Sequence, residues 1–258
     1  MTFIDTHTHI YDEAFLGEED AVVRRALDAG VEMMLQPDVD SREREAMFAL
    51  VGRHPGVMRP MLGLYPGSVD GGWRDELDKM LAYRDRDVVA IGEIGLDYHY
   101  GAEYAAEQKE AFRVQLELAA EMDLPVNIHL REATEDFFRI MDDCRHLGLR
   151  GALHAFSGSV ETFRRMLRYG EWYVGIGGVL TFKKSTLPQT VAQIPLEHII
   201  LETDSPYLTP APYRGQRNES SFIPLIAEKI ALVKGIGVEE VAEVTTASAR
   251  RLFNLTVQ

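Results

Sequence analysis

The 258-residue sequence predicts an α/β protein with the (β/α)8 TIM-barrel fold, in which residues 1–258 form a single domain. Three observations favour this fold. Short apolar runs alternate with longer segments of helical periodicity along the whole chain. The apolar runs are nearly continuous, as expected of parallel strands buried on both faces. No glycine-rich phosphate loop follows an early strand, which disfavours the alternative of a doubly wound open sheet.

The expected strands begin with Phe3-Ile4, directly before two histidines, His7 and His9. Seven later apolar runs have the length of strands and are bounded mostly by glycine, proline or polar residues. They occupy residues 31–35, 57–64, 88–93, 125–129, 152–154, 172–176 and 199–204. The fourth, fifth, sixth and eighth strands end in a carboxylate or a histidine, so polar groups recur at one end of the predicted sheet.

Helical patterns follow the expected strands in order. They occupy residues 18–30, 41–51, 73–83, 103–122, 134–147, 160–169, 187–194, 221–233 and 238–253. Gly30 suits the C-cap of the first helix, and Ser41 is the expected N-cap of the second. Pro188 makes the helix at 187–194 short and weak. Residues 205–219 contain proline and glycine and are expected to form a loop.

Composition restricts the class of protein. The formal net charge of −14 argues against a broad basic surface that grips duplex DNA, although a local positive site remains open. A single cysteine, Cys144, excludes an internal disulfide and fits a cytoplasmic location. The N-terminus does not resemble a signal peptide, and no apolar run approaches the roughly 20 residues of a membrane span. We expect no membrane partner and a monomer or weak oligomer.

Polar residues at the strand ends form the candidate functional site, because active sites of such barrels lie at the C-terminal ends of the strands. His7 and His9 are two residues apart on a strand and therefore face the same side. Such a pair alone is more often a chance occurrence. The strand ends together carry His7, His9, Glu93, His129, His154 and Asp204.

Four imidazoles and two carboxylates predict a site for one or two divalent metal ions. Zn²⁺, Mn²⁺ and Fe²⁺ suit this set, and Mg²⁺ is possible although it prefers oxygen ligands. Glu93 is placed to bridge two metals, and His7 and His9 are expected to hold one of them with Glu93 and Asp204.

A metal ion at this site would lower the pKa of a bound water to about 7 and supply a hydroxide nucleophile. Asp204 could ligate the metal and accept the proton. Two divalent ions contribute about +4, against −2 from Glu93 and Asp204, so the site would attract a phosphate or carboxylate. Glu202 lies on the same strand face as Asp204. It could orient a histidine or pair as a buried carboxylate with a cation inside the barrel, and both interpretations stay open.

Five stretches together resemble the TatD family of metal-dependent hydrolases, within the amidohydrolase-like barrels. They are IDTHTH at 4–9, GEIGLDY at 92–98, PVNIH at 125–129, LHAFSG at 153–158 and LETDSPYL at 201–208, extended by Arg214-Gly215 and Asn218-Glu219. The resemblance runs through the whole chain in order. It implies a deoxyribonuclease or phosphodiesterase with 3′-to-5′ exonuclease activity on single strands, and the same six residues as metal ligands.

The substrate side departs from the family pattern. The family usually has Gly-x-His-Pro-His after the third strand, where this chain has Gly63-Leu64-Tyr65-Pro66-Gly67. A serine that usually follows the fifth-strand histidine is Leu130 here, while Arg131 is kept. Asn218-Glu219 is followed by Ser220 in place of proline. These departures leave the metal site intact and change the residues expected near the substrate.

Candidate substrate-binding residues are Tyr65, Arg131 and Arg214. Arg131 could contact a phosphate, or be an ordinary solvated arginine. Tyr65 could stack on a base or donate a hydrogen bond, or simply pack. Arg214 and Arg217 could hold a phosphate, and an ion pair with Glu219 is equally consistent.

Two enzymatic functions follow. The first is cleavage of phosphodiesters, with single-stranded DNA as the expected partner, and Glu93 and Asp204 as catalytic residues. The second is hydrolysis of a carboxylic ester, amide or lactone, including an aminoacyl-tRNA deacylase-like activity, in which the metals polarise a carbonyl. A positive groove at the barrel mouth favours the first, and an enclosed apolar pocket favours the second. A non-enzymatic metal-binding role is disfavoured, because such ligand sets leave coordination positions open.

Overall fold

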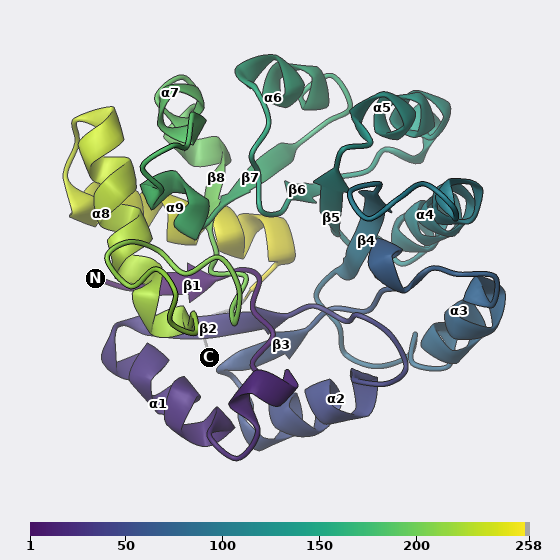
Figure 1. Cartoon of the computed structure of the whole chain (residues 1–258), viewed down its shortest axis with the longest axis horizontal. Coiled ribbons are helices and arrows are strands. Elements are labelled where there is room, and N and C mark those ends of the chain that lie inside the picture. The colour runs from purple at the N-terminus through teal and green to yellow at the C-terminus, as the bar shows by residue number, and fades with distance from the viewer. Residues whose placement is uncertain (256–258) are drawn as a thin grey trace.

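The computed structural model describes residues 1–255, and within them eight parallel strands form the centre of the molecule (Figure 1). The strands are short and almost completely buried. They are β1 (Phe3–Asp5), β2 (Val31–Gln36), β3 (Met58–Pro60), β4 (Ile91–Asp97), β5 (Val126–Arg131), β6 (Gly151–Leu153), β7 (Trp172–Ile176) and β8 (Ile199–Leu201). The near-continuous apolar sequence of each strand follows from this burial on both faces.

The strands are arranged as a (β/α)8 barrel. β1, β2 and β3 pair in order, and β4 to β8 pair in order, all in parallel. Backbone hydrogen bonds join the two groups at both seams. Leu62 N–H donates to the carbonyl of Ala90 at 3.1 Å between β3 and β4, and Thr6 N–H donates to the carbonyl of Leu201 at 2.9 Å between β1 and β8.

Helices surround the barrel and follow the strands along the chain (Figure 1). They are α1 (Glu19–Asp28), α2 (Arg44–Arg53), α3 (Trp73–Leu81), α4 (Ala105–Glu121), α5 (Thr134–Asp143), α6 (Val160–Met166), α7 (Leu187–Val191), α8 (Ile223–Lys234) and α9 (Val238–Phe253). The buried faces of the helices pack on the outer faces of the strands in one large apolar core. None of the helices among residues 1–255 is long and apolar enough to cross a membrane.

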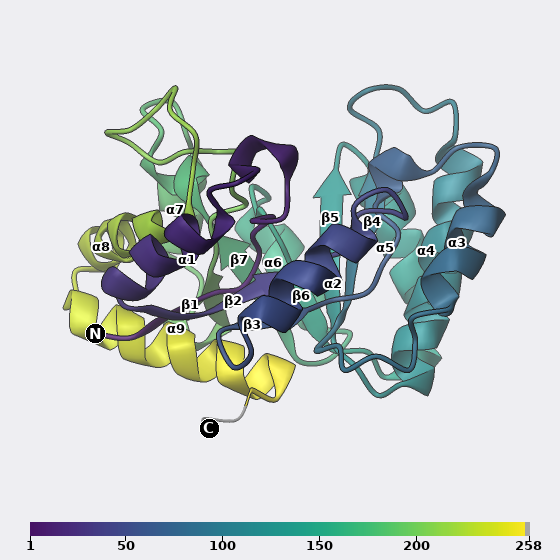
Figure 2. The same cartoon turned by 90° about the horizontal axis from the view of Figure 1, so that it is seen from below.

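The helix α9 has a different position from the others. It crosses the end of the barrel at which the strands begin, opposite the long loops (Figure 2). Ala249, Leu252 and Phe253 form a second apolar cluster with barrel residues that include Ile4 and Ile200. The barrel is therefore closed at this end, and the polar strand ends are accessible only from the other.

Several expected boundaries were wrong. The helix expected at 41–51 begins at Arg44, and Ser41 does not cap it. The carboxylate of Asp40 accepts the Arg42 N–H at 2.9 Å, and this turn delays the helix, while the Ser41 hydroxyl donates to Glu76. The third strand is shorter than 57–64, and the helix expected at 134–147 ends as an α-helix at Asp143.

All four of the polar strand ends also differ from expectation. β6 ends at Leu153 and β8 ends at Leu201, so His154, Glu202 and Asp204 lie after their strands. β4 does not end at Glu93 but continues to Asp97, because Gly95, Leu96 and Asp97 continue the pairing with β5. β5 likewise continues beyond His129 to Arg131. The side chains of Glu93 and His129 therefore come from within strands, where the backbone is held on both sides.

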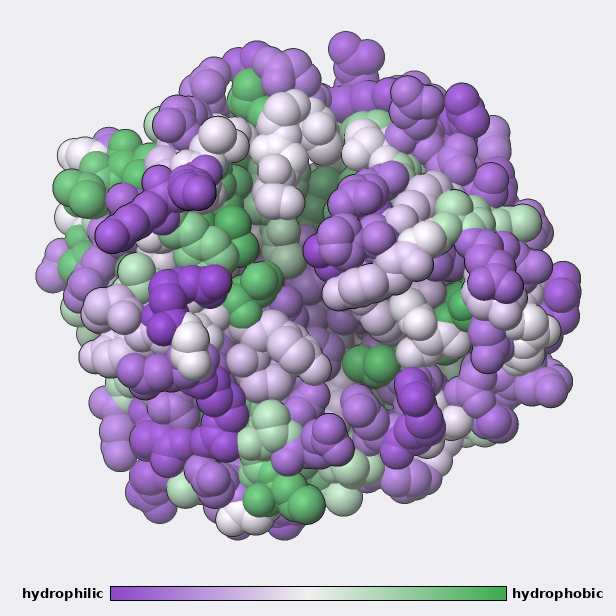
Figure 3. Space-filling model, viewed as in Figure 1, coloured by the Kyte–Doolittle hydropathy of each residue, from purple (hydrophilic) through white to green (hydrophobic). Residues whose placement is uncertain are grey.

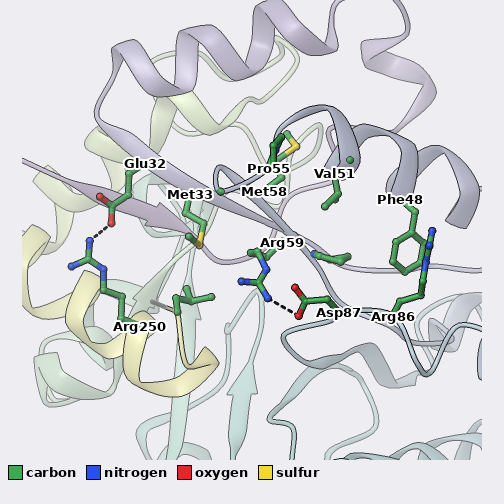
Figure 4. Close-up of a pocket in the computed structure, with 14 residues that line it drawn as sticks. Glu32, Met33, Phe48, Val51, Pro55, Met58, Arg59, Arg86, Asp87 and Arg250 are labelled. Atoms are coloured by element: carbon green, nitrogen blue, oxygen red, sulfur yellow. Dashed lines mark hydrogen bonds and ion pairs between the residues drawn. The ribbon is translucent and has the colours of Figure 1, made fainter. Parts of the chain in front are cut away.

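A cavity of about 560 Å³ lies away from these residues, at the end of the barrel near α9. Figure 4 shows that Arg250 pairs with Glu32 and Arg59 with Asp87 along its wall. None of its lining residues is a histidine, and its two carboxylates are already paired with arginines. This cavity therefore offers neither a histidine nor an unpaired carboxylate to a metal ion.

Candidate metal centre

The six predicted ligands meet at the open end of the barrel. His9, Glu93, His129, His154 and Asp204 line a hollow of about 240 Å³, and His7 lies buried beside them. Figure 3 shows this face of the molecule hollowed near its middle. The structure thus brings together residues that are up to 197 positions apart in the sequence.

His7 and His9 follow β1, whose end is fixed by Asp5. The Asp5 carboxylate accepts the Thr203 N–H at 3.0 Å and the Thr203 hydroxyl at 2.6 Å, which joins the ends of β1 and β8. The Nε2 atoms of His7 and His9 consequently point to the same place, 3.1 Å apart. The Asp204 carboxylate lies 3.7 Å and 3.6 Å from these two nitrogens.

His129 and His154 form a second group on β5 and after β6. The Nδ1 atom of His129 and the Nε2 atom of His154 are 3.2 Å apart. Glu93 lies between the two groups. Its Oε1 atom is 2.9 Å from His129 and 3.0 Å from His154, whereas its Oε2 atom is 3.4 Å from His7. Each oxygen of this carboxylate therefore faces a different pair of histidines.

The backbone holds Glu93 in this position. The Glu93 N–H donates to the carbonyl of Asp38 at 3.0 Å, and the Asp38 N–H donates to the carbonyl of Gly92 at 3.1 Å. The Asp38 carboxylate pairs with Arg44 at 2.7 Å and accepts the Gly63 N–H. Both partners of this ion pair are almost fully buried, so the loop after β2 is anchored beside the bridging carboxylate.

The donor set fits divalent cations. The outward nitrogen of His7 faces the amide oxygen of Asn127 at 2.8 Å, and an oxygen of this kind only accepts hydrogen bonds. The outward nitrogen of His9 faces Tyr11, whose hydroxyl donates to the carbonyl of Pro37. Both outward nitrogens therefore carry the hydrogen, and the two inward nitrogens present lone pairs to each other. Such an arrangement is repulsive unless a proton or a metal cation lies between them.

Three ligand groups follow from these distances. They are His7, His9 and Asp204; Glu93, His129 and His154; and His7, His154 and Glu202, each with ligand atoms within 4.8 Å of one another. The first two groups use the six residues expected from the sequence without overlap, so the residues can hold two ions with Glu93 between them.

The ionisation states of the histidines and carboxylates at the site depend on one another. Burial would raise the pKa of Glu93, but the surrounding histidines, His154 first, hold that pKa well below its ordinary value. Burial would lower the pKa of His154, but the charge of Glu93 raises it well above the ordinary value. A carboxylate held ionised among imidazoles is what a cation-binding site requires.

Tyr65 lies where the sequence predicts, on the wall of the hollow. Its ring meets that of His129 edge to face, with 5.2 Å between the ring centres. Arg131 does not line this hollow. It lines a neighbouring cavity of about 340 Å³, which shares His154 with the first.

Arg214 and Arg217 do not reach the hollow. Arg214 packs over the ring of Phe182 and donates to the carbonyl of Thr209. Arg217 pairs with Glu18, at 2.9 Å. Of the two interpretations left open for these arginines, the ion pair with Glu219 is excluded, because Glu219 pairs with Arg25 of α1, at 2.6 Å.

Sequence reasoning missed several residues around the ligands. Asp97 lies 2.8 Å from the outward nitrogen of His129, and its carboxylate also accepts the His99 N–H. Asn127 and Tyr11 lie behind His7 and His9. The alternation on a strand could have found Asn127, two residues before His129 and thus on the same face. Nothing in the local sequence identifies Tyr11.

Comparisons with known proteins agree with this architecture. The family model described as "TatD related DNase" matches residues 4–254. The uncharacterized metal-dependent hydrolase YabD of Bacillus subtilis is 37% identical over 262 residues, which covers 97% of this chain and 98% of the relative. The 3′-5′ ssDNA/RNA exonuclease TatD of Erwinia tasmaniensis is 33% identical over 259 residues, covering 97% and 99%.

Among solved structures, the crystal structure of YjjV, a TatD homologue from Escherichia coli K12, superposes with a TM-score of 0.89. It is 28% identical in sequence, and the match covers 98% of each chain. The family match spans all six candidate ligands.

Proposed function

The chain belongs to the TatD-related DNase family of metal-dependent hydrolases, and from this premise we propose that it removes nucleotides from the 3′ end of single-stranded nucleic acid. A relative of similar length carries the name of a 3′-5′ exonuclease. The observation that supports the proposal best is the Glu93 carboxylate, whose two oxygens face two separate pairs of histidines. A bridging carboxylate between two ions is the arrangement used for displacement at phosphorus.

The roles of the residues follow from their positions. His7, His9 and Asp204 would hold one divalent ion and His129 and His154 the second, with the Glu93 carboxylate between the two groups. Bound ions would supply Lewis acidity and a nucleophile derived from water near neutral pH. Zn²⁺, Mn²⁺ and Mg²⁺ are the candidate ions.

Asp204 is the proposed proton acceptor. Its side chain lies on the wall of the hollow and is the most exposed of the carboxylates around the ligands, at 16%. Burial would raise its pKa, but the neighbouring histidines, His9 first, lower it. Asp204 is therefore ionised and accessible to an attacking water, as a general base must be.

The rest of the hollow suits a terminal nucleotide. Tyr65 and Tyr207 line it and offer aromatic surfaces for a base. Asp12 and Glu43 line it too, so the wall itself carries negative charge. The attraction for phosphate therefore comes from the metal ions and from Arg131 in the adjoining cavity.

Cleavage of an end-labelled strand tests the proposal. Protein supplied with Mn²⁺ or Mg²⁺ is expected to shorten a 5′-labelled single-stranded DNA stepwise from its 3′ end, and the variant His129→Ala is expected to lose this activity. Failure of every divalent metal to support cleavage of DNA or RNA would contradict the proposal.

Hydrolysis of a small carboxylic ester, amide or lactone is the second candidate. The hollow around the histidines is small, about 240 Å³, and no arginine lines it. These features fit a compact substrate better than a long strand. Metal-dependent cleavage of carboxylic esters, with no cleavage of phosphodiesters by the same preparation, would favour this function.

A single cytoplasmic domain over residues 1–258 agrees with both candidates. The apolar core runs continuously from β1 to α9, and Cys144 is buried and unpaired. We propose that the enzyme acts there as a monomer or weak oligomer. Gel filtration of the purified protein tests the oligomeric state.

A further inference from the structure

The four histidines differ in the groups behind them. His7 and His9, which we call the neutral-backed pair, direct their outward nitrogens at uncharged groups. The Nδ1 atom of His7 is 2.8 Å from the amide oxygen of Asn127. The Nδ1 atom of His9 is 2.8 Å from the hydroxyl of Tyr11. These partners fix the orientation of each ring and add no charge.

His129 and His154, the carboxylate-backed pair, have charged partners. The Nε2 atom of His129 is 2.8 Å from the Asp97 carboxylate. The Nδ1 atom of His154 is 3.6 Å from the Glu202 carboxylate and has no hydrogen bond to another residue among 1–255. No described arginine or lysine lies within ion-pair distance of Glu202, which excludes the interior cation considered above.

The fold makes room for the buried Glu202 carboxylate. A Cβ atom on Gly175 of β7 would lie 1.9 Å from Glu202 Oε2, so only glycine allows the carboxylate to stand behind His154. Glu202 is fully buried, and its Oε1 atom accepts the Ala155 N–H. The contacts with Gly175 and with the Ala155 N–H therefore fix the position of this carboxylate behind His154.

Charged partners strengthen histidine ligands. A carboxylate that accepts the outward N–H of a metal-binding imidazole raises the basicity of the inward nitrogen, and losing such a partner typically weakens metal binding about 10- to 100-fold. Neutral partners give the orientation without the added charge.

We infer that the Asp97 carboxylate behind His129 strengthens metal binding at the carboxylate-backed pair about 10- to 100-fold. The neutral-backed pair lacks such a contribution, and its added charge comes from Asp204 as a direct ligand. Asp97, in contact with His129, and Glu202, 3.6 Å from His154, are positioning residues for the ion at the carboxylate-backed pair. The inference rests on the proposed function only in requiring that the site binds two ions.

Single-site variants make the two affinities measurable. His9→Ala leaves only the carboxylate-backed pair complete, and His154→Ala leaves only the neutral-backed pair. Metal-free full-length protein of each variant is titrated with Zn²⁺ by calorimetry, with a competing chelator where binding is tight. Circular dichroism and thermal unfolding of the metal-free variants check that each one is folded.

Two further substitutions exchange a charged for a neutral group, or the reverse, behind one histidine of each pair. Asp97→Asn in the His9→Ala protein is expected to weaken Zn²⁺ binding about 10- to 100-fold. Asn127→Asp in the His154→Ala protein is expected to tighten it. This replacement breaks no hydrogen bond, because the Asn127 amide nitrogen has no partner among residues 1–255. Asp97→Asn in the His154→Ala protein is the matched control, and it should leave the affinity unchanged.

Weaker Zn²⁺ binding after Asp97→Asn in the His9→Ala protein, together with tighter binding after Asn127→Asp in the His154→Ala protein, would support the inference. No response to Asp97→Asn in the His9→Ala protein, or an equal response to it in the His154→Ala protein, would overturn it while leaving the proposed hydrolase intact. Folded wild-type protein that binds no Zn²⁺ at all would overturn the proposed function, and the inference with it.

Discussion

Asp5 shows how a single residue outside the ligand set controls the site. It joins β1 to β8 through Thr203 and thereby aligns His7 and Asp204. It is fully buried and has no cationic partner among the described residues. Burial raises its pKa from 3.8 to about 7, although hydrogen bonds to Thr203 oppose the shift. Its position next to a histidine motif would not have indicated this structural role.

The raised pKa of Asp5 predicts a pH dependence of stability in the metal-free protein. The folded state binds the proton more tightly than the unfolded chain, so the contribution of Asp5 to the free energy of unfolding falls as pH rises from about 4 to about 7. The stability of wild type relative to Asp5→Asn should therefore decrease by up to about 4 kcal/mol over this range. Urea unfolding of both proteins at several pH values measures it, and a difference independent of pH would contradict the assignment.

Arg131 is the cation that we place against the substrate. It is exposed, and it lines the cavity that adjoins the metal centre at His154. Arg131→Ala should raise the KM for an oligonucleotide about tenfold or more, the effect of losing one charge-assisted hydrogen bond, with a smaller change in kcat. Steady-state kinetics measure both constants. Arg139→Ala on the outer face of α5, where Arg139 is 72% exposed, is the control and should change neither.

At the scale of elements, the loop after β2 anchors the bridging carboxylate through the buried pair of Asp38 and Arg44. Asp38→Ala leaves the guanidinium buried without its charge partner and should destabilise the protein by about 3–5 kcal/mol. Arg44→Met removes the unpaired charge, so the double variant should be more stable than Asp38→Ala alone. Chemical unfolding of Asp38→Ala, of Arg44→Met and of the double variant gives the free energies of unfolding for a double-mutant cycle. Strictly additive effects would show that the pair is not coupled.

Helices and strands with a clear apolar period were predictable from the sequence. The residues at which they begin and end were less predictable. The pattern at 238–253 matches α9, and the run at 172–176 matches β7, because each has a clear apolar period and sharp boundaries. Ser41 misled because the preceding Asp40 forms a competing turn. The length of β4 depends on pairing with β5, which is a contact between distant segments and leaves no local signal.

The convergence of the candidate ligands was predictable, because barrel topology brings the ends of neighbouring strands side by side. His7, Glu93, His129 and Asp204 could be combined from sequence alone once the eight strands were recognised. The groups behind the ligands could not, since Asp97, Tyr11 and Asn127 acquire their roles from side-chain geometry. The direction of Arg214, toward Phe182 and away from the hollow, is likewise set by the folded loop.

At the scale of the whole molecule, the ligands come from strands on both sides of the two seams of the barrel. Metal ions bind only the folded arrangement, so saturating metal should stabilise the protein by about 2.7 kcal/mol at 100 times the Kd. For a chain of this size, this corresponds to a rise in Tm of about 5–10 °C. Calorimetric scans with Mn²⁺ or Zn²⁺ and with a chelator measure the rise. Glu93→Gln should show a much smaller rise, and an equal rise in this variant would argue for metal binding elsewhere.

The central claim is that two divalent ions lie between these histidines and share Glu93. An anomalous difference map from crystals grown with Mn²⁺ or Zn²⁺ tests it directly. The account predicts two peaks, one beside His7, His9 and Asp204 and the other beside His129 and His154, with one Glu93 oxygen facing each. Crystals saturated with metal that show no peak at these positions, or only peaks remote from Glu93, would contradict it.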